Sequence, residues 1–306
     1  MSQPAAGSGP LPSLPDAGGN AVGRGIAWMV LAMALLASMD AASKILVQTY
    51  SVFQLLWIRH LVLLGLLLTI RGPRLVGTLF ESRRPVLQTV RVTALLVEMA
   101  MFMWAVRYLP LADTHALLAV SPLVVTALAW PILGEPVGLR RWFAVLVGFV
   151  GVLIIIRPGF GVFQLAALIP LAGAALWAGY QVMTRLVSRT DGADTAFVYL
   201  AVAGSILPGL LMPWVWITPQ SLSHWLLFGL ISLLGAGGHA CLLTALRTAP
   251  AAGLQPFSYT LLIWAALWGL LIFGHFPDSL TIAGAALVVG SGLYTWHRER
   301  VLSLPR

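Results

Sequence analysis

The feature that most constrains this chain is a series of ten apolar runs, each about as long as a membrane-spanning helix. A helix needs roughly 20 apolar residues to cross the hydrocarbon core of a bilayer. Breaks rich in glycine, proline and charge, such as "LGEPVGLRR" and "SRTDGAD", separate the runs. The pattern predicts an all-α polytopic membrane protein with ten transmembrane helices, at about 25–47, 52–70, 88–108, 111–133, 139–156, 163–186, 194–214, 223–246, 250–274 and 279–297.

Composition supports the same class of protein. Only 9% of the 306 residues are charged, against about 25% in a soluble domain. The net charge of +8 does not indicate nucleic acid, because the basic residues gather at the ends of the apolar runs. The single cysteine, Cys241, excludes an intramolecular disulfide and a cysteine-based metal cage. We therefore expect the lipid bilayer and a small molecule as partners, with no metal and no cofactor, and a monomer suffices.

Lysine and arginine also predict the orientation. If the N-terminus is inside, thirteen arginines fall on the cytoplasmic side and only Arg107 and Arg157 on the external side. Cytoplasmic loops are enriched in basic residues, so the chain is predicted to be N-in and C-in in the inner (plasma) membrane. Residues 1–23, rich in Pro, Gly, Ala and Ser, are predicted to be a disordered cytoplasmic tail. The thirteen are Arg24, Arg71, Arg74, Arg83, Arg84, Arg140, Arg141, Arg185, Arg189, Arg247, Arg298, Arg300 and Arg306.

The two halves of the chain repeat each other. "AVRYLPLADTHALL" from Ala105 aligns with "ALRTAPAAGLQPFS" from Ala245 at an offset of 140. "SKIL" from Ser43 lies over "TRLV" from Thr184. The repeats are predicted at 24–158 and 159–300, five helices each. Because five is odd, the second repeat must enter the membrane inverted, an architecture common in secondary transporters.

The segment "RYLPLADTHALLAVSPLVVTALAWPILGEPVGLRRWFAVLVGFVGVLIIIRPG" resembles the EamA-type repeat of the drug/metabolite transporter superfamily. The matching features are Tyr-x-Pro, a proline within the fourth helix, Gly-Glu-Pro, and a fifth helix ending in Arg-Pro-Gly. The second half resembles the same repeat but has Gly274-His275 where Gly-Glu is usual. The resemblance implies a ten-helix carrier without an ATP-binding domain, similar to bacterial aromatic amino acid exporters.

Ionisable residues within the predicted helices are the first candidates for a substrate site. Asp40, Lys44, Arg59, Glu98 and His115 lie at overlapping depths in the outer half of the membrane. Facing lipid would cost at least ~2.5–3.5 kcal/mol for each charge, so these groups should pair or line water. Asp40 and Lys44 are four residues apart, which allows either a salt bridge within one helix or a gate that contacts substrate.

Aromatic residues and prolines complete the candidate set. An aromatic-lined cavity with a few polar anchors would suit a flat or apolar substrate group, although helix packing is the alternative for each residue. Interior prolines remove a backbone hydrogen bond, so Pro122 and Pro256 are predicted hinges of the fourth and ninth helices. The predicted lining residues are Trp104, Trp177, Tyr180, Gln181, Tyr259 and Trp264.

Together these features predict a secondary transporter that works by alternating access. The first expectation is export of an aromatic or other apolar amino acid, with Arg59 and Lys44 meeting the carboxylate and Glu98 or Asp40 the ammonium group. Alternatives are a carrier for a vitamin, nucleoside or drug-like cation and, in another class, a membrane-embedded enzyme or scaffold. The sequence contains no Walker A, Gly-x-Ser-x-Gly or HExxH motif, which speaks against an enzyme.

Overall fold

The computed structural model describes residues 19–133, 139–156, 163–249 and 251–303, and its regular elements in these ranges are all helical. Most of the predicted tail lies outside the described residues, and residues 19–23 already belong to the first helix. The elements are α1 (Gly19–Leu46), α2 (Val52–Arg71), the 3-10 helix η1 (Pro73–Glu81), α3 (Pro85–Tyr108), α4 (Leu111–Leu118), α5 (Ser121–Leu133), α6 (Leu139–Ile156), α7 (Phe163–Val187), α8 (Ala193–Gly209), α9 (Met212–Val215), α10 (Leu222–Thr248), α11 (Ala251–Ser258), α12 (Thr260–Phe273) and α13 (Ser279–Ser303).

Six of the described helices are long and apolar enough to cross a membrane, which confirms the predicted class of all-α membrane protein. They cover Val22–Leu46, Val52–Arg71, Pro85–Tyr108, Ala166–Thr184, Leu222–Ala245 and Pro256–Phe273. Four shorter apolar helices lie at Leu111–Val125, Trp142–Ile156, Asp194–Gly209 and Ser279–Tyr294.

The ends of several helices follow from local sequence. The Ser51 side chain accepts a hydrogen bond from the Phe53 N–H and so caps α2, and Ser221 caps α10 in the same way through the His224 N–H. Pro85 stands at the start of α3, where the missing N–H of proline costs nothing. Gly274 ends α12 with φ 67°, a left-handed conformation that glycine adopts without strain.

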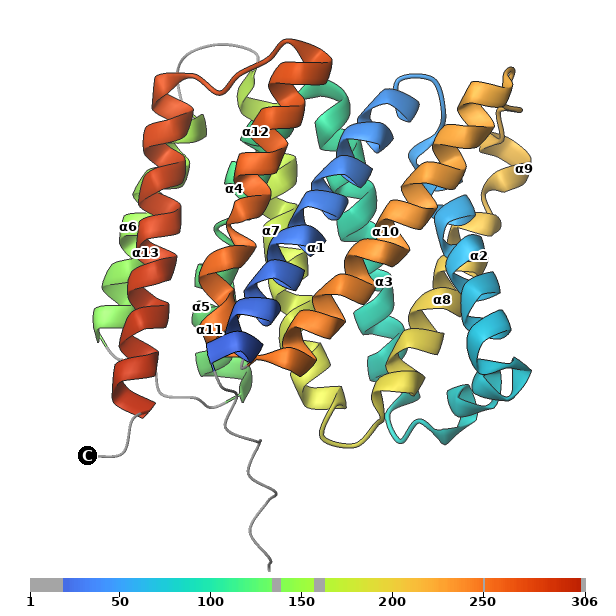
Figure 1. Cartoon of the computed structure of the whole chain (residues 1–306), viewed down its shortest axis with the longest axis horizontal. Coiled ribbons are helices and arrows are strands. Elements are labelled where there is room, and N and C mark those ends of the chain that lie inside the picture. The colour runs from blue at the N-terminus through green and yellow to red at the C-terminus, as the bar shows by residue number, and fades with distance from the viewer. Residues whose placement is uncertain (1–18, 134–138, 157–162, 250, 304–306) are drawn as a thin grey trace, which may run out of the picture.

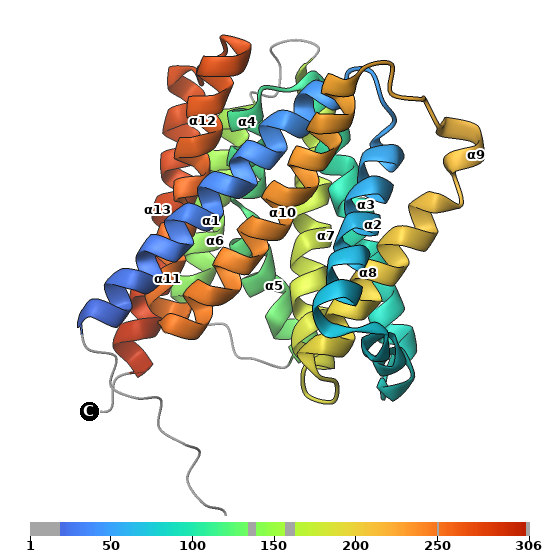
Figure 2. The ribbon, with the colours of Figure 1, turned by 45° about the vertical axis from the view of Figure 1, so that its right-hand side comes forward.

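The helices run side by side in a bundle, and α1 lies along α10 in both views (Figures 1 and 2). The other extensive contacts join α3 to α7, α2 to α8 and α6 to α13. The start of α1 and the end of α13 lie at the lower side of Figure 1, together with η1 and the turn at 188–192. We call this side the terminal face; the turns at 47–51 and 274–278 lie on the opposite face.

Two backbones touch where α6 meets α13. A Cβ on Gly151 would lie 2.7 Å from the Gly284 carbonyl oxygen, and a Cβ on Gly284 would lie 2.5 Å from the Gly151 oxygen. No side chain fits at either position, so these glycines allow the close approach of the two helices.

The helices that follow α3 and α10 are both interrupted. The break between α4 and α5 falls at Ala119 and Val120, and the break between α11 and α12 falls at Tyr259. Pro256 lies within α11, and Pro122 is the second residue of α5. Each proline removes one backbone donor from the turn beside the break, which explains why the helix is discontinuous there.

Candidate substrate site

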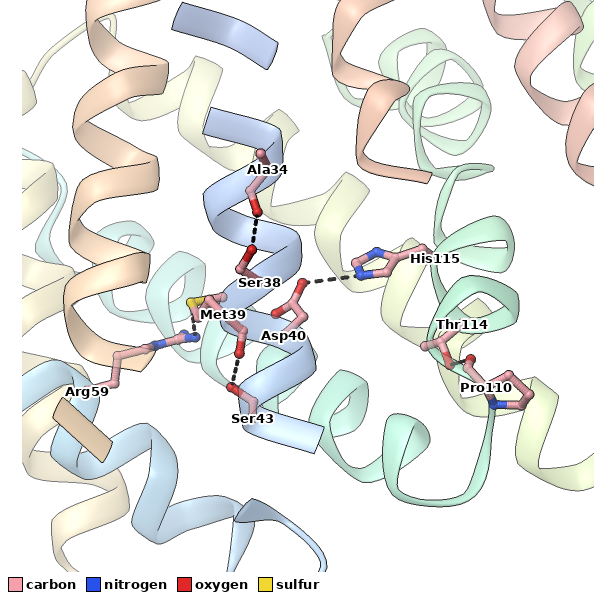
Figure 3. Close-up of polar contacts among 9 residues, drawn as sticks. All are labelled: Ala34, Ser38, Met39, Asp40, Ser43, Arg59, Pro110, Thr114 and His115. Carbon is pink, nitrogen blue, oxygen red and sulfur yellow. Dashed lines mark hydrogen bonds and ion pairs between the residues drawn. The ribbon is translucent and has the colours of Figure 1, made fainter. Parts of the chain in front are cut away.

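Four helices bring ionisable side chains together inside the bundle: Asp40 from α1, Arg59 from α2, Glu98 from α3 and His115 from α4. We call these residues the charged cluster. Asp40, Glu98 and His115 are each less than a tenth exposed. His115 Nε2 lies 3.2 Å from Asp40 Oδ2, a close contact without the alignment of a hydrogen bond (Figure 3). A buried group of this kind in an apolar bundle is a candidate functional site.

Among the described residues, Arg59 has sulfur atoms as its hydrogen-bond acceptors. Its Nη1 donates to Met39 Sδ at 3.6 Å, and its Nη2 donates to Met99 Sδ at 2.8 Å. Asp40 and Glu98 are the acidic groups whose charges act on it. Thioethers are weak acceptors, so a guanidinium with five donors keeps most of its hydrogen-bonding capacity for a ligand.

Two histidines lie beside Arg59. His60 Nδ1 is 2.7 Å from the Leu56 carbonyl oxygen, and His239 Nδ1 is 2.8 Å from that of Gly235. A carbonyl oxygen only accepts, so in both rings Nδ1 carries the proton and Nε2 is the acceptor. His60 and the two methionine partners of Arg59 were not predicted from the sequence; the signal for His60 was its place directly after an intramembrane arginine.

Lys44 does not pair with Asp40. Its Nζ donates to the Leu109 carbonyl oxygen at 2.5 Å and stands 5.1 Å from the centre of the Phe273 ring, and the Asp113 charge acts on it. The i, i+4 salt bridge considered from the sequence is therefore not what the structure contains. Lys44 instead ties the end of α1 to the turn between α3 and α4.

Trp104 lies away from the charged cluster. It stacks edge-to-face on Tyr108 at 4.9 Å and is 43% exposed. Val90, Val97, Trp104 and Tyr108 form one exposed apolar stripe along α3, whereas Glu98 faces the interior. An exposed apolar stripe on a membrane helix suits contact with lipid.

The remaining predicted aromatic residues do not gather into one wall. Trp177 stacks on Tyr180 at 5.4 Å, with the half-buried Gln181 beside them on α7. The Tyr259 hydroxyl lies against Gly292 of α13. Trp264 packs among apolar residues of α1 and α10, and its buried Nε1 has no hydrogen-bond partner among the described residues. The aromatic residues therefore belong to several separate helix contacts.

A second polar network lies at the terminal face; we call Ser82, Gln88, Arg91 and Asp191 the terminal latch. The Asp191 carboxylate accepts hydrogen bonds from the Ser82 hydroxyl at 2.5 Å, from Gln88 Nε2 at 3.0 Å and from the Arg83 N–H at 3.1 Å. Slight burial opposes ionisation, but these hydrogen bonds outweigh it and hold the pKa of Asp191 below its ordinary value.

Arg91 extends the terminal latch from α3 to α7 and α8. Its Nε donates to Gln88 Oε1 at 3.1 Å, and its Nη2 donates to the Ala196 carbonyl oxygen at 3.1 Å. Its Nη1 lies 3.3 Å from Thr184 Oγ1 and 3.4 Å from the Tyr180 hydroxyl. Arg91 had no predicted role; the only local signal was its i, i+3 spacing from Gln88.

Aromatic contacts join the 47–51 turn to α10 at the opposite face. The buried Tyr50 ring meets Phe228 edge-to-face at 5.2 Å, and its hydroxyl lies 2.7 Å from His224 Nδ1. The Gln54 side chain bonds both the N–H and the carbonyl oxygen of Ile217. Within the part of the chain that the structure describes, no group of three His, Cys, Asp or Glu side chains could hold a metal ion.

Known proteins similar to this chain are transporters. A riboflavin transporter of Vibrio cholerae is 34% identical over 65% of this chain and 67% of its own length. A pseudopaline exporter of Pseudomonas aeruginosa is 28% identical over 87% of this chain and 93% of its own. An S-adenosylmethionine uptake transporter of Rickettsia prowazekii is 24% identical over 90% and 93%. The chain is accordingly a small-molecule transporter of the membrane and not an enzyme.

A solved crystal structure shares the fold, with a TM-score of 0.58 at 18% identity over 93% of this chain and 99% of the other. Two stretches, residues 23–157 and 164–295, each match the EamA-like transporter family and together make up most of the chain. The resemblance to this family in the drug/metabolite transporter superfamily is thus confirmed, and the chain belongs to the EamA-like transporter family.

Proposed function

We propose that this protein is an inner-membrane carrier that moves a vitamin-type heteroaromatic metabolite by alternating access, with riboflavin as the first candidate. The observation that carries the proposal is the buried charged cluster, in which Arg59 donates to two thioether sulfurs and interacts with the charges of Asp40 and Glu98. A relative named a riboflavin transporter supports this substrate, and no relative reported above is named for an amino acid. Amino acids are therefore the comparison substrates in the transport test below.

The chemistry of the cluster suits such a substrate. Riboflavin presents imide carbonyls and ring nitrogens that accept hydrogen bonds, and an imide N–H and ribityl hydroxyls that donate them. Arg59 supplies donors and Glu98 supplies acceptors. Met39 and Met99 offer polarizable surface for a flat ring. We assign substrate contact to Arg59 and Glu98, with Trp177 and Gln181 as further candidates on the neighbouring α7.

The architecture that we propose has ten spans, N-in and C-in, in two inverted repeats. The six long and four shorter apolar helices among the described residues support this number. The helix contacts support the repeat: in the alignment α1 corresponds to α7 and α10 to α3, and both α1–α10 and α7–α3 are extensive pairs. The breaks after α4 and α11 also fall 140 residues apart, at Ala119 and Tyr259, which suits hinges near Pro122 and Pro256.

Alternating access requires a closure on each side of the site. At an offset of 141, Asp191 corresponds to Tyr50, and at an offset of 140, Gln88 corresponds to Phe228. The pair Asp191–Gln88 belongs to the terminal latch, and the pair Tyr50–Phe228 closes the opposite face. Equivalent positions thus meet at both faces, which supports an occluded arrangement with the charged cluster between two closures.

The test is transport by the purified protein in proteoliposomes. Labelled riboflavin is compared with labelled phenylalanine and tryptophan, for the wild type and for Arg59→Ala, Glu98→Ala and Trp104→Phe. We expect riboflavin to enter unchanged, with at least a tenfold loss of rate in the two cluster variants. Trp104→Phe is the matched control on the exposed stripe and should transport at the wild-type rate.

Two results would overturn the proposal. Transport of the amino acids without riboflavin would favour amino acid export and refute the vitamin assignment. Wild-type rates in correctly inserted Arg59→Ala and Glu98→Ala variants would remove Arg59 and Glu98 from the substrate site.

A further inference from the structure

We propose that Asp40 and His115 form a proton-binding site, and that one proton crosses the membrane in each transport cycle. The inference rests on the proposed carrier function and adds the ion that drives it. Neither residue then needs to touch the substrate, whose contacts stay with Arg59 and Glu98. The ligand of this site is a proton taken from the water on either side of the membrane.

The geometry of the pair suits proton binding. His115 Nε2 and Asp40 Oδ2 are 3.2 Å apart and both side chains are buried, yet Nε2 makes no aligned hydrogen bond in the described structure. Phe102 packs against the imidazole at 5.0 Å and shields it. A proton on Nε2 would attract the carboxylate, and a rotation of the imidazole would align the N–H bond with Asp40 as a charge-assisted hydrogen bond. The same N–H bond breaks when the proton leaves.

Charged groups of other helices act on the pair. Arg59 of α2 and Glu98 of α3 both interact with Asp40, and Lys44 interacts with Asp113 further along α1 and α4. A proton held between Asp40 and His115 places a cation beside the Asp40 carboxylate, and a paired buried charge costs less than an unpaired one.

The other histidines near the cluster are less suited to hold that proton. His60 on α2 and His239 on α10 each use Nδ1 on a carbonyl oxygen of their own helix. The Arg59 charge acts on both rings and repels a second cation. Among the described residues His115 is the histidine whose ring nitrogen lies within 4.0 Å of a carboxylate oxygen, so the proton is assigned to this pair.

The position of the pair couples the proton to movement. Asp40 belongs to α1, and His115 belongs to the last turns of α4, just before the break at Ala119 and Val120. Proton binding strengthens the α1–α4 contact, and proton release weakens it. Since a helix break is a place where a segment can turn, the protonation state can bias which face is open.

The experiment uses proteoliposomes with the membrane potential clamped at zero. For one proton per substrate, a gradient of one pH unit should support an accumulation of labelled riboflavin of about tenfold. Asp40→Asn and His115→Gln should reduce this ratio to about one, while riboflavin exchange without a gradient stays measurable. His275→Gln, at an exposed histidine in the 274–278 turn, is the matched control and should keep the tenfold ratio.

The outcomes separate this inference from the proposed function. Wild-type exchange without accumulation under the pH gradient would overturn proton coupling and leave the carrier intact. Accumulation that persists in both variants would move the proton site elsewhere and refute this pair. Loss of exchange in both variants, with unchanged size-exclusion profiles, would place the pair in the substrate site instead. Absence of exchange in the wild type would refute the proposed function and the coupling with it.

Discussion

Replacing Asp191 with alanine should open the terminal face. The substitution removes the acceptor of three hydrogen bonds, from Ser82, Gln88 and the Arg83 N–H. A buried hydrogen bond to a charged group contributes about 1.5–3 kcal/mol, but Asp191 is partly exposed and water replaces much of what is lost. We estimate a total of about 1–2 kcal/mol. That free energy corresponds to a change of about 5–30-fold in the ratio of closed to open molecules.

The assay is a distance measurement by electron paramagnetic resonance. Spin labels at Arg84→Cys and Arg189→Cys, both at exposed positions, flank the terminal latch in a Cys241→Ala background. The unaltered latch should give one short distance, and Asp191→Ala should add a longer, substantially populated one. Asp194→Ala is the matched control, because its ion pair with Arg71 is more than half exposed and contributes little. An unchanged distance distribution in Asp191→Ala would refute the reasoning.

Two further predictions concern helix packing and pH. Gly284→Ala should lower the thermal unfolding midpoint in detergent, because its Cβ would lie 2.5 Å from the Gly151 oxygen and overpacking costs ~1–3 kcal/mol. Gly290→Ala is the control, since a Cβ there meets open space, and it should leave the midpoint unchanged. Equal midpoints for the two variants would contradict the packing account. Because the pKa of Asp191 is lowered, the stabilisation by its carboxylate is full above the ordinary value and lost as the pH falls through the lowered one. The spin-label distance should therefore stay constant from pH 8 to about 5, and opening within that range would contradict the hydrogen bonds assigned to Asp191.

Sequence reasoning predicted the class of protein because apolar length and hydropathy are local properties. The sequence could also have placed Trp104 on the exposed face of its helix, because Val90, Val97 and Trp104 recur at intervals of seven residues while Glu98 lies on another face. Helical periodicity, applied residue by residue, separates a lipid-facing tryptophan from one that lines a site.

The partners of the charged residues could not be predicted in the same way. The spacing of Asp40 and Lys44 favours a salt bridge within one helix. In the structure Asp40 instead contacts His115 of α4, and Lys44 donates to the Leu109 carbonyl oxygen. Arg91 likewise takes its partners from α7 and α8. Such pairs depend on how helices rotate and cross, which local spacing does not specify.

The most direct test of the carrier assignment is counterflow. Proteoliposomes loaded with unlabelled riboflavin are diluted into a trace of labelled riboflavin without any ion gradient. A carrier with alternating access should show a transient accumulation of label above its equilibrium level, in chemically unchanged form, and Arg59→Ala should abolish it. Simple equilibration without an overshoot, or chemical conversion of the label, would contradict the account.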